Sequence, residues 1–156
     1  AWESSLPDDC VRYGIPIVLA EKTSPCVGAS SGPMRQGPDA ALEALDHIGV
    51  AMIASGMQRG SSPINPGAAG NLIETVVQVL RRGAVTRLFV EGGGTASALV
   101  RRMGWARSSV CGQFAPGVVA VRVASEPAVI LTTKPGSYLW PMEVWEVACR
   151  DTYRPA

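Results

Sequence analysis

Short apolar runs alternate along the chain with segments whose apolar residues recur at helical spacing. Continuous apolar stretches predict buried strands at residues 15–20, 50–54, 85–90, 118–123 and 128–132. Helical spacing predicts helices at residues 39–48, 69–82, 95–103 and 142–149. This alternation is typical of an α/β fold, in which β-α-β units build a three-layer α/β/α sandwich around a mainly parallel sheet. Only a few residues, including Pro127, separate the last two strands, so we expect that pair at a sheet edge.

The length and the uniform composition indicate one domain over residues 1–156, without an internal repeat. In a parallel sheet, ligands bind beyond the carboxyl ends of the strands. Three polar or glycine-rich loops follow predicted strand ends, at residues 55–56, 92–94 and 132–136. We expect these three loops to converge on one ligand site.

The glycine turn at residues 92–94 is the most informative of these loops. It follows the apolar run that ends at Val90 and Glu91, and Thr95 comes directly after it. Glycine lets a backbone approach a ligand closely and adopt positive φ, as we expect at Gly93, and Thr95 can cap the following helix. The N–H groups of that helix's first turn would then attract an anion such as phosphate. The alternative is a tight turn that needs glycine only for packing.

Residues around the later loop could complete such a site. Lys134, one of two lysines in the chain, could meet a phosphate as a point charge or be an ordinary solvated lysine. Glu91 could hold a ribose hydroxyl or a magnesium-bound water, or cap an exposed strand end. Tyr138 and Trp140 could stack on an adenine, although aromatic residues in such a place are more often packing.

Composition and charge exclude several classes of function. The formal net charge of +1 predicts neither nucleic-acid binding nor attraction to an anionic membrane. No apolar run reaches the ~20 residues that span a bilayer, and no basic leader opens the chain, so the cytoplasm is the expected location. The four cysteines are widely spaced and are expected to be reduced, and with one histidine we expect no protein metal site. No catalytic base is visible, so the chain fits half of an active site better than a whole one.

An ordered set of motifs resembles the carboxy-terminal, nucleotide-binding half of the four-carbon acid sugar kinases. The motifs occupy residues 91–100, 103–105, 115–118 and 131–138, and the resemblance is best over residues 82–156. At the glycine turn Gly92, Gly93 and Thr95 match the family, whereas Gly94 stands where members have an acidic residue.

In the later motif Lys134 and Gly136 match, and Tyr138 stands in place of phenylalanine. The resemblance implies that Gly92, Gly93, Gly94, Thr95, Lys134, Gly136 and Ser137 bind ATP with Mg²⁺. It further implies a kinase that transfers phosphoryl groups in carbohydrate metabolism, with the acid sugar held by a partner domain or subunit that this chain lacks. The alternative is a non-catalytic relative that binds another phosphorylated or carboxylated metabolite. The acceptor and any self-association stay open.

Overall fold

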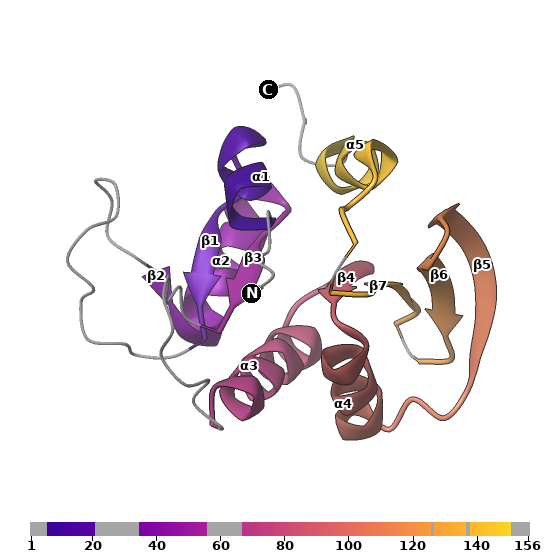
Figure 1. Cartoon of the computed structure of the whole chain (residues 1–156). Helices are drawn as coiled ribbons and strands as arrows, with labels where there is room; N and C mark the ends of the chain where they lie inside the picture. The colour runs from indigo at the N-terminus through magenta and orange to yellow at the C-terminus, as the bar shows by residue number, and fades with distance from the viewer. Residues whose placement is uncertain (1–5, 21–34, 56–66, 126, 137, 151–156) are drawn as a thin grey trace.

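The computed structural model describes residues 6–20, 35–55, 67–125, 127–136 and 138–150 (Figure 1). The helices are α1 (Leu6–Arg12), α2 (Gly37–Ile48), α3 (Ala68–Arg82), α4 (Gly93–Met103) and α5 (Met142–Arg150). The strands are β1 (Ile17–Leu19), β2 (Arg35–Gln36), β3 (Met52–Ala54), β4 (Arg87–Glu91), β5 (Ser108–Ala115), β6 (Val118–Val123) and β7 (Val129–Lys134).

The described strands form two sheets rather than one. The first has the order β2-β1-β3 and is parallel throughout. The second has the order β4-β7-β6-β5, in which β4 pairs with β7 in parallel and the other neighbours are antiparallel. The protein is therefore α/β as expected, but the second sheet is mixed and not mainly parallel.

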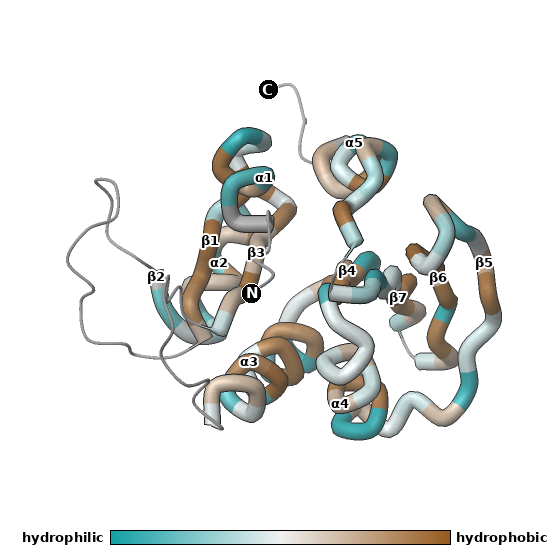
Figure 2. Tube along the Cα trace, viewed as in Figure 1, coloured by the Kyte–Doolittle hydropathy of each residue, from teal (hydrophilic) through white to brown (hydrophobic). Residues whose placement is uncertain are grey.

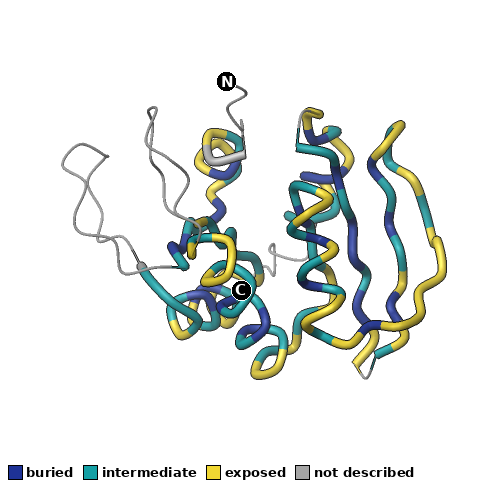
Figure 3. The backbone as a smooth tube through the Cα atoms, turned by 60° about the horizontal axis from the view of Figure 1, so that its bottom comes forward, coloured by how far each residue is buried: buried dark blue, intermediate teal, exposed yellow. Residues whose placement is uncertain are grey.

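The second sheet also differs from the sequence prediction in its order. The pair β6 and β7 was expected at an edge, but both strands lie inside the sheet, and β5 forms the edge (Figure 3). Strand β5 was not predicted from the sequence, because its first four residues are exposed and Gly112 interrupts its apolar pattern. Helix α1 was also missed by the sequence prediction, and Asp8 and Asp9 lie in its first turn.

The four longer helices appear where helical spacing predicts them. Helix α2 begins at Gly37, two residues before Asp39, so Asp39 does not cap the helix and instead pairs with Arg82 at 2.6 Å. The arginine pairs at residues 81–82 and 101–102 occupy the last turns of α3 and α4, where the helix dipole favours cations.

Apolar clusters join the helices to the sheets. Figure 2 shows the hydrophobic stretches of these elements in brown. Helices α3 and α4 cover one face of the second sheet through a core that includes Val77, Val90, Leu99 and Leu131. Helices α1 and α5 pack together through Cys10, Ile15, Val144 and Trp145, and this cluster reaches Phe89 on the opposite face of β4. None of the described helices is both long and apolar enough to cross a bilayer.

Candidate functional site

The turn after β4 presents a row of free backbone donors. Gly92 precedes α4 with φ +95° and ψ 121°, and the first hydrogen bond of the helix runs from the Ala96 N–H to the Gly92 carbonyl, at 3.0 Å. The N–H groups of Gly93, Gly94 and Thr95 find no acceptor in the part of the chain that the structure describes. A Cβ at Gly93 or Gly94 would meet open space. The start of α4 is thus an accessible cradle of three amides with partial positive charge.

Two local expectations at this turn are wrong. Thr95 is the third residue of α4 and makes no capping hydrogen bond, because the helix begins at Gly93. Positive φ belongs to Gly92 and not to Gly93. The backbone must reverse direction between the strand and the helix, and Gly92 is the residue that absorbs this change.

The loop after β7 lies directly beside the glycine turn. The Gly92 N–H donates to the Lys134 carbonyl at 2.8 Å, and Glu91 and Lys134 stand opposite each other in the parallel register of β4 and β7. The Lys134 side chain is 1% exposed, and its Nζ lies 3.2 Å from Glu91 Oε2. The same Nζ donates to the carbonyls of Pro135, Gly136 and Tyr138.

Lys134 therefore holds its own loop in place and is not a solvated lysine. Its ammonium is enclosed below the surface, next to the carbonyls of the loop. Gly136 takes part through its carbonyl, and Ser137 lies outside the described residues. No local pattern predicts this pairing, because the partner Glu91 is set only by the register of two strands that are far apart in the chain.

Glu91 also receives a hydrogen bond from the indole of Trp140. The Nε1–H donates to Glu91 Oε2 at 3.1 Å, and Lys134 Nζ lies 5.4 Å from the centre of the Trp140 ring. Trp140 is 8% exposed and meets Phe89 edge to face, so it belongs to the core. Tyr138 is half-exposed, and its ring lies against Gly117 in the turn between β5 and β6, too close for a Cβ there.

A large cavity separates the two sheets. It measures about 710 Å³ and runs between the edge strands β3 and β4, whose outer edges have no neighbouring strand among the described elements. Its lining is mainly apolar and includes one side of α3. Ser55, directly after β3, and Glu91 and Thr95, on either side of the glycine turn, line this cavity. The expected convergence of the three loops on one ligand site stays a prediction. Most of the loops after β1 and β3 lie outside the described residues.

Among the described residues that line this cavity, the titratable ones are Asp8, Cys10, Arg87 and Glu91. Burial raises the pKa of the Cys10 thiol to about 12, and the charge of Asp9 adds to the effect. Cys10, Cys111 and Cys149 are free thiols, and Cys26 lies outside the described residues. Within the described ranges no three acidic, histidine or cysteine side chains group as a metal site would require.

The sequence matches a family of nucleotide-binding C-terminal domains over residues 38–138. The chain belongs to this family. The match includes the glycine turn, β7 and the Lys134 loop, and it confirms the resemblance seen in the sequence. No protein of curated function matches the sequence.

Solved structures share the fold. One is a DUF1537 protein from Bordetella bronchiseptica, a domain-swapped dimer with bound citrate, at 11% identity and a TM-score of 0.63. Another is a DUF1537-family protein from Haemophilus influenzae, at 17% identity and a TM-score of 0.61. They cover 93% and 95% of this chain, which itself spans only 35% and 38% of their lengths.

Proposed function

We propose that this domain binds ATP with Mg²⁺ and presents it for phosphoryl transfer to a sugar acid held by a partner domain. The family supports a nucleotide as the ligand. The observation that carries the proposal is the set of three free N–H groups at Gly93, Gly94 and Thr95. Such donors at a helix start suit phosphate oxygens, since they need no side chain and bring no reorganisation with them.

The proposed roles of the α4 amides and of Lys134 differ from those that the sequence motifs suggest. The free amides of α4 would contact the phosphates, whereas Lys134 would act beneath them by holding its loop against Gly92. Mg²⁺ commonly keeps several waters and binds substrate phosphates with one or two carboxylates. Because Glu91 is engaged by Lys134 and Trp140, the metal would rest chiefly on the phosphates.

The acceptor side of the reaction would come from elsewhere. Phosphoryl transfer depends mainly on positioning and charge neutralisation, which a nucleotide site can supply by itself. The chain spans about a third of the length of the related structures. We propose that a further domain or subunit binds the acid sugar and supplies the catalytic base. We propose that this chain alone binds nucleotide and shows no kinase activity.

Calorimetric titration of MgATP into the wild-type chain and Gly93→Val tests the amide cradle. Nothing stands near the Cβ position of Gly93, so the variant should stay folded while its side chain covers the donors. We expect micromolar to millimolar binding for the wild type and at least a tenfold loss in the variant. Gly70→Val is the control, because Gly70 also faces open space but lies on α3, outside the glycine turn.

Two results would contradict the proposal. One is the absence of heat with the wild type at millimolar MgATP, while a sugar phosphate or a sugar acid raises the melting temperature. That result would favour a relative that binds another metabolite. The other is normal ATP binding by Gly93→Val, which would place the phosphates away from α4.

A further inference from the structure

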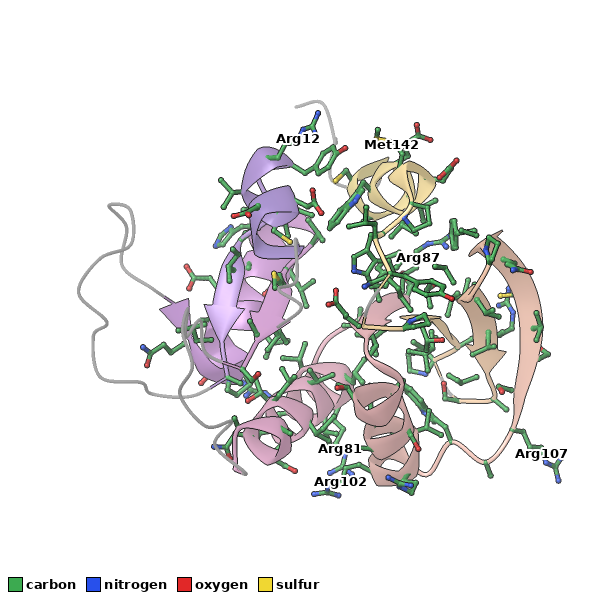
Figure 4. The ribbon with its side chains drawn as sticks, viewed as in Figure 1. Arg12, Arg81, Arg87, Arg102, Arg107 and Met142 are labelled. Atoms are coloured by element: carbon green, nitrogen blue, oxygen red, sulfur yellow. The ribbon has the colours of Figure 1, made fainter. Side chains whose placement is uncertain are left out.

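The face of the second sheet that points away from α3 and α4 is only partly covered. Helix α5 and its neighbours reach this face around Phe89, Phe114 and Val118. Beyond them a hollow of about 310 Å³ lies over β4, β7, β6 and β5. Figure 4 shows Arg87 on this side of the sheet, between α5 and the strands. The hollow is close to the lower limit of size for small-molecule sites.

Two arginines stand in one row across the floor of this hollow. Arg87 on β4 is opposite Ile130 on β7, and Ile130 is opposite Arg122 on β6. Two strand spacings separate the arginine Cα atoms by roughly 10 Å. Both side chains are exposed, and neither has an ion-pair partner in the described part of the chain. Their long side chains can therefore converge on one ligand above Ile130.

The third feature is a buried hydroxyl. Thr132 lies two residues beyond Ile130 on the same face of β7, lines the hollow and is 2% exposed. Its Oγ1 has no hydrogen-bond partner among the described residues, whereas the buried Thr75 hydroxyl reaches the Ala20 carbonyl. An unsatisfied buried polar group carries a free-energy cost that a bound ligand or water can remove.

Arg87, Arg122 and Thr132 can all donate hydrogen bonds to a bound acceptor. A guanidinium offers donors and no acceptor, and a threonine hydroxyl can donate to an acceptor above it. Two unpaired cations and a donor around an apolar floor suit an oxyanion with two negative charges.

We propose that Arg87, Arg122 and Thr132 form a binding site for a small dianion, either a phosphate group or a dicarboxylate. Arg87 begins β4 and Gly92 follows its end, so about five residues of strand, roughly 17 Å, separate this site from the α4 amides. Arg122 and Thr132 line this hollow and not the large cavity, whereas Arg87 lines both. The site includes none of the α4 amides and does not depend on the proposed nucleotide cradle. Its size fits a metabolite and not a macromolecular surface.

Nuclear magnetic resonance of the arginine side chains tests the site directly. Inorganic phosphate and, separately, succinate are titrated into the chain at constant ionic strength, and the Nε–Hε signals are followed. We expect the signals of Arg87 and Arg122 to shift together with one saturable millimolar constant for at least one of the two anions. Arg107, which lies just before β5 outside the hollow, is the control and should not respond.

Substitutions distinguish anion binding at this site from non-specific attraction of anions to the positive charges of the protein. Arg87→Gln or Arg122→Gln should weaken binding of the responding anion at least tenfold, and Arg107→Gln should leave it unchanged. Thr132→Val should weaken anion binding severalfold and yet raise the melting temperature of the anion-free protein, because it removes an unsatisfied hydroxyl. A purely structural threonine would not produce these opposite signs.

Three outcomes would overturn the proposal. The first is shifts of Arg87 and Arg122 that fail to saturate or that Arg107 shares. The second is unchanged anion affinity in both arginine variants. The third is anion binding in Thr132→Val as tight as in the wild type. In Gly93→Val the Nε–Hε signals of Arg87 and Arg122 should still shift with the anion. Failure of the nucleotide proposal would therefore be distinguishable from failure of the anion-site proposal.

Discussion

At the scale of single residues, the glycine turn shows three neighbouring glycines with different roles. Gly92 alone has positive φ, and a Cβ there would lie 3.5 Å from Thr95 Oγ1, so backbone strain and not crowding excludes other residues. Gly93 and Gly94 have ordinary helical backbones and leave open space above the free amides. The sequence shows three identical letters, and only the backbone distinguishes them.

This difference predicts opposite effects of alanine within the turn. Gly92→Ala should lower the free energy of unfolding by about 1–2 kcal/mol, since left-handed backbone is costly for a residue with Cβ. Gly94→Ala should be neutral or stabilising by up to about 1 kcal/mol, because alanine suits a helix better than glycine. Urea unfolding of both variants measures this contrast. Equal effects would mean that Gly92 does not carry the turn's positive φ in solution.

The Cys10 thiol predicts a loss of stability in alkaline solution. Its folded-state pKa of about 12 exceeds the ordinary value of 9.0, so the folded state holds the proton more tightly than the unfolded state. The contribution is complete below pH 9 and disappears as pH rises from 9 toward 12. The free energy of unfolding of the wild type should therefore fall more steeply over this range than that of Cys10→Ala. Parallel curves would contradict the buried, protonated thiol.

At the scale of elements, Lys134 joins β7, its following loop and the end of β4. Its ammonium pairs with Glu91 and donates hydrogen bonds to three loop carbonyls, while its own carbonyl accepts the Gly92 N–H. The turn that carries the free amides thus rests on the neighbouring loop. The two motifs of the sequence, the glycine turn and the Lys-x-Gly loop, are physically one unit.

Removal of this cation should be costly. Lys134→Met leaves Glu91 without its ion-pair partner and several carbonyls without a donor, and we expect a loss of about 3–5 kcal/mol in the free energy of unfolding. Arg102→Gln is the control, because it breaks the half-exposed pair with Glu74 and should cost at most about 1 kcal/mol. Denaturant unfolding compares the two. If Lys134→Met cost no more than the control, Lys134 would not anchor the loop.

At the scale of the whole molecule, the two sheets meet across a cavity and not through paired strands. Among the described strands, β3 and β4 each pair on one side only, and residues of both line the same cavity. In each of these strands alternate backbone groups therefore point away from any neighbouring strand. The backbone N–H groups along these two strand edges can therefore be followed separately from those inside the sheets.

Hydrogen exchange should reveal the unpaired edge of β4. Strand β7 lies between β4 and β6, so its successive amides should exchange slowly, whereas amides of β4 should alternate between slow and fast. The fast set is expected because every second N–H of β4 faces the cavity. Amide-resolved exchange by nuclear magnetic resonance measures the pattern. Uniformly slow exchange along β4 would show that its free edge is paired in solution.

The sequence by itself determined much of the local structure and the family. Helical spacing placed α2, α3, α4 and α5 to within about two residues, because the burial of one helix face follows a period that the chain displays. The glycine turn and the helix that starts directly after it could also be predicted, since they depend on consecutive residues, whereas anion binding there stays a prediction. The motifs around residues 91–138 were sufficient to indicate the nucleotide-binding family that the comparison confirms.

Only the tertiary structure decided the order of the strands, the edge position of β5 and the pairing of Lys134 with Glu91. These features depend on the register between strands, whose paired residues are 8 positions apart in Gly112–Ala120 and 43 apart in Glu91–Lys134. No local pattern records which strand pairs with which, because strand order is set by the packing of all helices and strands together. Thr132 lies two residues along β7 from the row of Arg87, Ile130 and Arg122. Its hydroxyl has no hydrogen-bond partner among the described residues, and for the same reason this is visible only in the folded chain.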